Sequence, residues 1–310
     1  MKIGLIDVDS HNFPSLPLMK LSAWHKRNGD SVEWYKPMMS GHMDIVYMSK
    51  VFSFTEDYLF AVDADNIIRG GSGYAVRLVD GKEIYDKSAD KQLPYEIEHI
   101  YPDYSLYPNL TKDTAYGFLT RGCPRACDFC HVGVKEGRCS VKVADLSEFW
   151  NGQKNIVLCD PNLIACKEWK SLLQQLIDSK AYIDITQGVD ARILTEEKAE
   201  LLSKLRIKNI HFAWDRYEDR DMILPKFKMF KEISGWSYQK MTVFVLTNFD
   251  TTFEQDLERV YILREMGYNP YVMIYNKSNT TGKDDVRRLQ RWVNNRRIFN
   301  TISSFKEYAG

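Results

Sequence analysis

The sequence lacks any long hydrophobic run and has no excess of charge of either sign. No stretch approaches the roughly 18 apolar residues that a membrane-spanning helix needs, so we expect no membrane partner. Lysine plus arginine (42) balances aspartate plus glutamate (42), and this balance argues against a global field that would draw the chain to nucleic acid or to an acidic membrane. The apolar start already carries Asp7 and Asp9, which predicts a first strand and not a signal peptide.

Cysteine is also scarce, with 6 in 310 residues. So few cysteines do not suggest a disulfide scaffold, and we expect a reducing cytoplasmic location. Three of them nevertheless form a Cys-x3-Cys-x2-Cys group at the end of an apolar run: Cys123, Cys127 and Cys130. Three thiolates within eight residues can converge on one inorganic centre, and iron–sulfur clusters and zinc are the usual occupants.

A fourth ligand for such a centre is not obvious. The nearest candidates are His131 and Cys139, and neither belongs to a second Cys-x2-Cys knuckle of the zinc-ribbon kind. Three ligands without a clear fourth indicate an open coordination site, which is the kind that supports chemistry.

The segment Gly122-Cys-Pro-Arg-Ala-Cys-Asp-Phe-Cys130 resembles the signature of the radical S-adenosylmethionine (radical SAM) superfamily, including the aromatic Phe129 before the third cysteine. The resemblance implies a [4Fe–4S] cluster bound by Cys123, Cys127 and Cys130, with S-adenosylmethionine chelating the fourth iron. It implies reductive cleavage to methionine and a 5′-deoxyadenosyl radical, which abstracts hydrogen from a small molecule, peptide or nucleic acid. An electron donor such as flavodoxin or ferredoxin is implied as a partner.

The chain after about residue 109 alternates strand-like and helix-like segments, which predicts parallel βα units. A stripe of apolar residues begins at Trp169, Thr195 reads as a helix N-cap, and Thr251-x-x-Glu254 reads as a capping box. The expected strands are 116–120, 155–159, 182–186, 209–214, 241–246 and 270–275. Their number matches the open (β/α)6 partial barrel that the resemblance implies for residues 109–310, with the cysteine loop at the carboxyl end of the first strand.

The other strand ends should line the cofactor site. By resemblance, Asp160 stands where many relatives place a Gly-Gly-Glu that grips the methionine amino group, and Arg192 could clamp the carboxylate. Gln187 and Asp215 are candidates for sugar hydroxyls, and Phe129 completes the expected cofactor-binding set. Each of these residues, Phe129 apart, could instead be a loop residue with a local hydrogen bond.

Residues 1–108 predict a small Rossmann-like α/β domain followed by a linker, with strands at 2–7, 32–35, 44–48 and 66–69. The layout resembles the N-terminal domain of cobalamin-dependent superfamily members, and His11 partly echoes their cobalt-ligating loop. Because Pro14 replaces the loop glycine, cobalamin binding is possible but not favoured. The pair Gly70-Gly71 is interpreted as a turn.

The remaining cysteines, Cys139, Cys159 and Cys166, could hold an auxiliary cluster, but buried free cysteines behave as small hydrophobes, and we favour a single cluster. Positive charge gathers near the C-terminus and could contact a nucleic-acid backbone, although a solvated helix face is the preferred interpretation. The basic residues are Lys283, Arg287, Arg288, Arg291, Arg296 and Arg297. The alternative function is a non-catalytic zinc or structural-cluster protein that binds nucleic acid.

Overall fold

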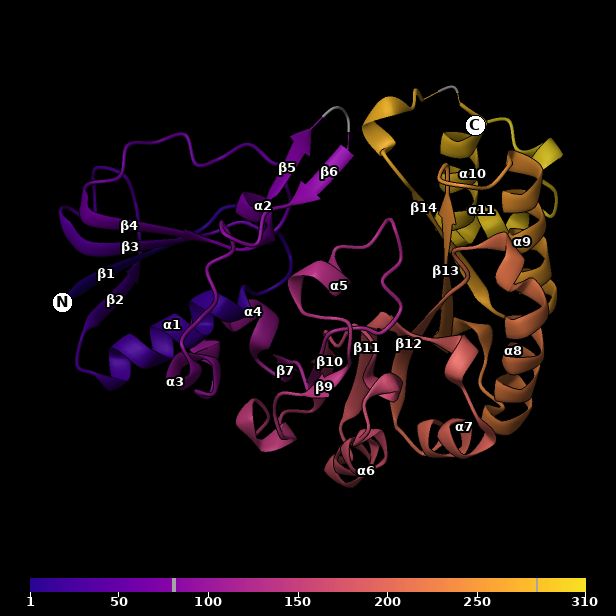
Figure 1. The fold of residues 1–310 in the computed structure, drawn as a ribbon, viewed down its shortest axis with the longest axis horizontal. Coiled ribbons are helices and arrows are strands. Elements are labelled where there is room, and N and C mark those ends of the chain that lie inside the picture. Colours follow the sequence, from indigo (N-terminus) through magenta and orange to yellow (C-terminus); the bar gives the residue numbers. More distant parts are fainter. Residues whose placement is uncertain (80–81, 283) are drawn as a thin grey trace. The chain divides into compact units, whose positions relative to one another are not determined.

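The computed structural model describes residues 1–79, 82–282 and 284–310, so Lys283 of the basic group lies outside the described residues. The chain divides into two compact units (Figure 1). Unit 1 comprises residues 1–117, 134–136 and 144–156, and unit 2 comprises residues 118–133, 137–143 and 157–310. Both units are built from helices and parallel strands, which confirms the α/β class.

Unit 1 contains the four expected strands in the order β2-β1-β3-β4, all parallel. Pro17 lies in the first turn of α1, where its missing N–H costs nothing, and Gly29 follows the helix with φ of 82°. The elements are β1 (Lys2–Asp7), α1 (Leu16–Arg27), β2 (Ser31–Trp34), β3 (Met43–Ser49) and β4 (Ala64–Gly70). Ile3 and Leu5 of β1 are completely buried in the core of this unit.

The segment after β4 adds short elements to unit 1. They are α2 (Ser72–Ala75), β5 (Val76–Val79), β6 (Lys82–Tyr85), α3 (Tyr95–Glu98) and α4 (Pro108–Thr111). Tyr107 anchors the end of this segment, because its hydroxyl donates to Asp7 Oδ2 at 2.6 Å and its ring packs edge-on against Trp34. The linker is therefore packed onto the strand ends of its own unit.

The second sheet holds six parallel strands in sequence order, β7-β10-β11-β12-β13-β14. The strands are β7 (Thr114–Gly117), β10 (Asn155–Leu158), β11 (Tyr182–Val189), β12 (Ile207–Ala213), β13 (Met241–Thr247) and β14 (Asn269–Ile274). The helices between the later strands are α6 (Trp169–Ser179), α7 (Glu196–Ser203), α8 (Arg220–Ser234) and α9 (Phe253–Glu265). This succession confirms the six expected βα units, and β7 and β14 are the two edges of an open sheet.

The helices of unit 2 follow their sequence signals with one correction. Leu172, Leu173 and Leu176 of α6 are buried as the apolar stripe predicts, and the Thr195 hydroxyl caps α7. The capping box of α9 uses Thr252 and Gln255, one residue later than expected. The Thr251 hydroxyl instead donates to Asp256 Oδ1 at 2.5 Å, so two adjacent threonines made the N-cap ambiguous in the sequence.

The first strand of the second sheet also differs from expectation. The sequence predicts one strand over 116–120, whereas β7 ends at Gly117 and a separate two-residue strand, β8 (Thr120–Arg121), follows. The backbone N–H groups of Leu119 and Thr120 donate to the Asp160 carboxylate. Because these two amides are taken by a side chain, they are not available to extend the ladder of β7.

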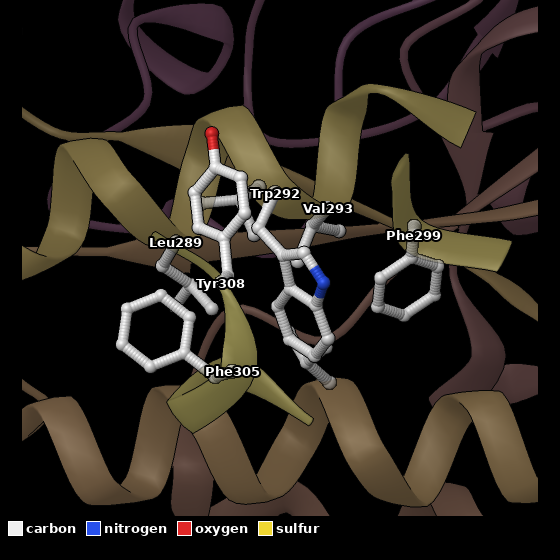
Figure 2. Close-up of a cluster of buried hydrophobic side chains, with 8 residues drawn as sticks. Leu289, Trp292, Val293, Phe299, Phe305 and Tyr308 are labelled. Carbon is white, nitrogen blue, oxygen red and sulfur yellow. The ribbon is translucent and has the colours of Figure 1, made fainter. Parts of the chain in front are cut away.

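The C-terminal residues close unit 2 at β14. Helix α10 (Asp285–Asn294) and helix α11 (Arg296–Thr301) surround a buried aromatic cluster in which Trp292 lies between Tyr308 and Phe299 (Figure 2). The Asn294 side chain accepts from the Val272 N–H at 2.8 Å and donates to the Val272 carbonyl at 3.0 Å. This amide satisfies the edge of β14 as a neighbouring strand would.

No helix in the described part of the chain combines the length and the hydrophobicity needed to cross a bilayer.

Candidate metal centre

The cysteine motif lies in a loop that a short hairpin closes. Strand β8 pairs antiparallel with β9 (Val141–Lys142), with Thr120 opposite Lys142, and residues 122–140 form the loop between them. The Cys123 N–H donates to the Gly137 carbonyl at 3.1 Å, which folds the two sides of the loop together. The short helix α5 (Val132–Lys135) follows the third cysteine.

Two residues of the motif have left-handed backbone conformations. Gly122 has φ of 83° directly before the first cysteine, and Ala126 has φ of 47° directly before the second. Glycine adopts this region without penalty, but a Cβ makes it unfavourable at Ala126. The turn between Cys123 and Cys127 therefore holds Ala126 in a strained backbone conformation.

The three thiols are free and lie close enough to influence one another. Cys123 and Cys127 are partly exposed and Cys130 is an exposed residue. Desolvation raises the pKa of Cys127 and of Cys130, and the charge of the Cys123 thiolate would raise both further. The Arg192 guanidinium acts in the opposite direction on Cys127. A thiolate at Cys123 therefore disfavours proton loss from Cys127 and Cys130, unless a cation intervenes.

The donor set fits a soft metal centre better than a preformed ionic site. Thiolates prefer iron–sulfur clusters and zinc, and Arg192 and Arg216 supply positive charge that lowers the pKa of Cys127. Among residues 1–79, 82–282 and 284–310, no group of three or more His, Cys, Asp or Glu side chains is arranged to hold a single metal ion. Binding would thus require the three thiols to turn toward a common centre.

Residues between the cysteines attach the loop to the carboxyl ends of the next strands. Arg125 Nε donates to Asp190 Oδ2 at 2.6 Å, and Asp190 directly follows β11. Arg216, which follows β12, donates from Nη2 to Asp128 Oδ2 at 2.9 Å. The pair with Asp190, which is 6% exposed, is the stronger attachment of the cysteine loop, because Asp128 in the other pair is 76% exposed. Sequence reasoning missed both pairs, although charged residues inside a cysteine motif were the available signal.

Phe129 adds an apolar attachment at the end of β13. Its ring packs edge-on against Phe249, with ring centroids 5.4 Å apart, and Phe249 packs in the same way against Tyr275 after β14. An edge-to-face aromatic pair contributes about 0.5–1.5 kcal/mol beyond its buried area. The aromatic position before the third cysteine therefore contacts protein here, and its expected cofactor contact stays a prediction.

Asp160 is fully buried and holds the base of the hairpin. Its carboxylate accepts from the Leu119 and Thr120 amides, the latter at 2.6 Å, and from the Thr120 hydroxyl at 2.7 Å. Burial raises the pKa of Asp160 to about 6, and these donors only partly offset that effect. The carboxylate predicted to contact the methionine amino group thus already has local partners, and that contact stays a prediction.

Asn162 is the polar residue in direct contact with a cysteine sulfur. It is 2% exposed, and its Nδ2 donates to Cys123 Sγ at 3.5 Å. Its backbone carbonyl accepts from the Ser140 hydroxyl on the other side of the loop. Within the described residues, Asn162 Oδ1 is buried without a hydrogen-bond partner, which costs about 1–3 kcal/mol. An acceptor held unsatisfied beside the first cysteine is suited to a donor that arrives with a ligand.

The predicted carboxylate clamp, Arg192, is held by two acids. Its Nε donates to Asp190 Oδ1 at 2.7 Å, and its Nη1 donates to Asp219 Oδ2 at 3.0 Å. Burial alone would lower the pKa of Arg192, but the hydrogen bond and charge of Asp190 raise it. Since Asp190 also binds Arg125, one carboxylate orients both a loop arginine and a strand-end arginine.

The other two predicted site residues differ in their surroundings. Asp215 lies after β12, and burial raises its pKa to about 6 despite the nearby charges of Arg259 and Arg192. The charge of its carboxylate adds to the raised pKa of Cys127 and of Cys130, after the larger effect of burial. Gln187 is exposed at the end of β11, where the register shifts, and its side chain forms no hydrogen bond with any described residue. Its predicted contact with sugar or substrate is not tested by this arrangement.

A buried arginine that sequence reasoning did not identify joins two strand ends. Arg259 of α9 is completely buried, and its guanidinium donates to the carbonyls of Trp214, at 2.6 Å, and Leu246, at 2.7 Å. It also pairs with Asp256 at 2.5 Å. Arg259 thereby satisfies carbonyls that follow β12 and end β13, next to Asp215. An arginine on an otherwise amphipathic helix gave no sequence signal for this role.

The remaining cysteines divide by burial. Cys159 and Cys166 are 6% and 1% exposed, whereas Cys139 is exposed in the same loop as the motif. Burial raises the pKa of Cys159 to about 12, so it persists as a neutral thiol. Burial and neutrality at Cys159 agree with the interpretation that it acts as a small hydrophobe.

Of the two cobalamin-like features of unit 1, the glycine pair has a packing explanation. Gly71 has φ of 99°, and a Cβ there would lie 2.2 Å from the Lys50 carbonyl oxygen, so the glycine pair permits a close chain approach. His11 is exposed with φ of 51° and forms no side-chain hydrogen bond with any described residue. Cobalamin binding stays a prediction that is not favoured.

No protein-family model matches this sequence, and no curated protein matches it. A solved structure that resembles the chain is that of Streptococcus suis SuiB, with a TM-score of 0.42 and 14% sequence identity. The resemblance covers 62% of this chain and 48% of that one, so the chain spans about half the length of SuiB.

Proposed function

We propose that this protein is a radical SAM enzyme whose [4Fe–4S] cluster is bound by Cys123, Cys127 and Cys130. The observation that carries the proposal is the placement of the cysteine motif in a closed hairpin loop, attached by ion pairs to the carboxyl ends of neighbouring parallel strands. Reactive groups of parallel α/β proteins gather at this edge of the sheet. When bound, the cluster supplies one electron that cleaves the sulfonium of S-adenosylmethionine, giving methionine and the deoxyadenosyl radical.

The residues of this chain would divide the work of holding these groups. The three thiolates bind iron, and Arg192 offers a guanidinium toward a carboxylate while Asp190 keeps it oriented. Asn162 donates to Cys123 Sγ and presents an unsatisfied oxygen beside it. Asp215, which is buried after the end of β12, is the candidate acceptor for hydroxyl donors. A reductant such as flavodoxin or ferredoxin would provide the electron.

The test is anaerobic reconstitution with iron and sulfide, followed by addition of dithionite and S-adenosylmethionine. The proposal requires about four iron and four sulfide per chain, a broad visible absorption band and release of 5′-deoxyadenosine. Well-folded protein that stays colourless and binds one zinc would instead support the structural-metal alternative. Protein that assembles the cluster but never cleaves S-adenosylmethionine would contradict the enzymatic part of the proposal.

A further inference from the structure

A concave region lines the open edge of the second sheet in unit 2. It is a cavity of about 820 Å³ formed by β14, the segment at Lys277, and helices α10 and α11. The region is open to solvent along much of its extent and is not an enclosed pocket. None of the cysteines or of the predicted cofactor residues lines this cavity, so it is distinct from the candidate metal centre.

The charge of the cavity has one sign. Its lining includes Lys277, Arg291, Arg296 and Arg297, and no acidic residue among those described. None of these four cations forms an ion pair with a described residue, and Arg291 donates only to the Gly282 carbonyl, at 2.9 Å. Residues 277–310 carry eight lysines and arginines against three acids, in a chain that is neutral overall. The positive charge is therefore concentrated here and not neutralised locally.

The three amide side chains of the lining already form hydrogen bonds within the protein. The side chains of Gln290 and Asn294 bind the Val272 backbone at the edge of β14. Asn295 Oδ1 caps α11 by accepting from the backbone N–H groups of Arg297 and Ile298. The groups left to bind a ligand are therefore the four cations, the hydroxyl of Tyr308 and the exposed ring of Tyr271, which is 42% accessible.

The cavity adjoins a row of rings on one face of the sheet. Tyr271 packs edge-on against Phe244, and Phe244 stacks on His211, with centroids 4.9 Å apart. Burial lowers the pKa of His211, and the charge of Arg296 lowers it further. Phe244 and His211 are half-buried, so Tyr271 is the exposed ring at the cavity end of this row. Cations that follow a backbone, beside rings on which bases stack, are the combination that single-stranded nucleic-acid sites use.

We propose that this cavity binds the phosphodiester backbone of a single-stranded nucleic acid. Arginine matches phosphate oxygens with two parallel N–H donors, and three arginines and a lysine around one open cavity suit several consecutive phosphates. The proposal is independent of the metal centre, because binding can be measured on protein without a cluster. A free mononucleotide offers the same phosphate chemistry and is distinguished by competition.

The experiment measures fluorescence anisotropy of a labelled single-stranded RNA, and of the matching DNA, of about 12 nucleotides with the full chain. Four phosphate contacts predict that affinity falls about 50-fold between 50 and 200 mM salt. The double variant Arg296→Glu/Arg297→Glu should weaken binding at least tenfold and reduce the salt dependence by about half. Glutamate suits the N-terminal turn of α11, so the variant should fold, and its circular dichroism spectrum and melting temperature are compared with those of the unmodified chain.

The matched control is Lys204→Glu/Lys228→Glu, which makes the same charge change at two exposed positions of unit 2 outside the cavity. It should bind the oligonucleotides within about twofold of the unmodified chain. Equal losses in the two double variants, or no binding by the unmodified chain at 50 mM salt, would overturn the proposal. Competition by AMP as strong as that by the unlabelled oligonucleotide would also overturn the proposal, because it would indicate a mononucleotide site. The same holds if the Arg296→Glu/Arg297→Glu variant keeps its oligonucleotide binding and loses binding only to phosphatidylserine vesicles or to polyglutamate.

Discussion

The two units each carry a candidate metal-ligand loop after the first strand of a sheet, and the loops are held in different ways. After β1, Asp9 accepts from the Val51 and Phe52 amides, and Asp7 accepts from Tyr107 and Ser10. These bonds fix the backbone but none of them orients His11. In the cysteine loop, side chains that alternate with the ligands make the attachments, which leaves the thiols unblocked.

The difference shows what a ligand loop needs besides ligand residue types. A metal ligand usually depends on outer partners that fix its direction. Cys123 has such a partner in Asn162 Nδ2, whereas His11 has none within the part of the chain that the structure describes. We therefore expect metal chemistry in the cysteine loop and none at His11.

The largest effect is expected from the cysteines themselves. Replacing Cys123, Cys127 or Cys130 singly by alanine should abolish 5′-deoxyadenosine release and reduce bound iron and sulfide severely, because each thiolate is one of three protein ligands. The matched control is Cys166→Ala, which removes a buried thiol outside the loop and should leave cleavage nearly intact. Full iron content in any of the three loop variants would remove that cysteine from the ligand set.

The next effect concerns the hairpin that carries the loop. At about pH 4, where the folded protein holds this carboxyl protonated, Asp160→Ala should lower the free energy of unfolding by about 1–3 kcal/mol, because it leaves the buried donors of Leu119 and Thr120 unsatisfied. Urea unfolding measures the change, and Asp178→Ala on the exposed face of α6 is the control. A loss below about 0.5 kcal/mol would show that the carboxylate does not hold the strand end.

The same carboxylate gives a prediction of pH dependence. Burial raises the pKa of Asp160 to about 6 from 3.8, so the unfolded chain loses this proton at a lower pH than the folded chain. The contribution of Asp160 to stability should therefore fall as pH rises from about 4 to about 6. The pKa of Asp215 is likewise raised to about 6, so both carboxyl groups contribute to the fall in stability with rising pH. Asp160→Asn should therefore remove about half of their combined slope of unfolding free energy against pH. An unchanged slope in this variant would contradict the assignment.

Breaking the attachment to β11 should have a smaller effect, confined to the loop. Asp190→Ala removes the acceptor of both Arg125 and Arg192 and should speed amide hydrogen exchange in residues 122–133 severalfold, with slower iron uptake. Glu197→Ala, which removes an exposed ion pair with Lys170, is the control and should change neither, since exposed pairs contribute little. Unaltered exchange in the loop of the Asp190 variant would show that the ion pairs do not order it.

We expect Asn162 to affect the midpoint potential of the cluster more than its assembly. A hydrogen bond to a cluster sulfur stabilises the more negative, reduced state, so Asn162→Leu should shift the midpoint potential downward, on the order of tens of millivolts. Redox titration followed by electron paramagnetic resonance measures the shift. Asn162→Gln, which can restore the donor, should recover part of it. Equal potentials in all three proteins would leave Asn162 without a role at the sulfur.

The smallest effect is expected at His11, which belongs to the loop after β1 and not to the cysteine loop. His11→Ala should leave iron content, cleavage and thermal stability unchanged, because the side chain is exposed and forms no hydrogen bond with a described residue. Binding of cobalamin to the unmodified chain, lost in this variant, would reverse our view of unit 1.

Most of the fold was accessible from the sequence because it depends on local and periodic signals. The stripe of α6 and the six apolar runs were read correctly, since burial of one face repeats along a helix and buried parallel strands are continuously apolar. The break between β7 and β8 was not predicted, because the residue that causes it, Asp160, lies 40 residues from Thr120 along the chain. The N-cap of α9 was displaced by one residue because two threonines are chemically equivalent there.

The sequence by itself determined the ligand types of the candidate centre and their spacing, because both are written in a few consecutive residues. Only the tertiary structure decided which residues surround them: Arg125 with Asp190, Asp128 with Arg216, and Asn162 against Cys123. The tertiary structure also gathered Arg291, Arg296 and Arg297 around a cavity, where the sequence favoured a solvated helix face. Such pairings depend on which strand ends meet across a sheet, and no local pattern encodes them.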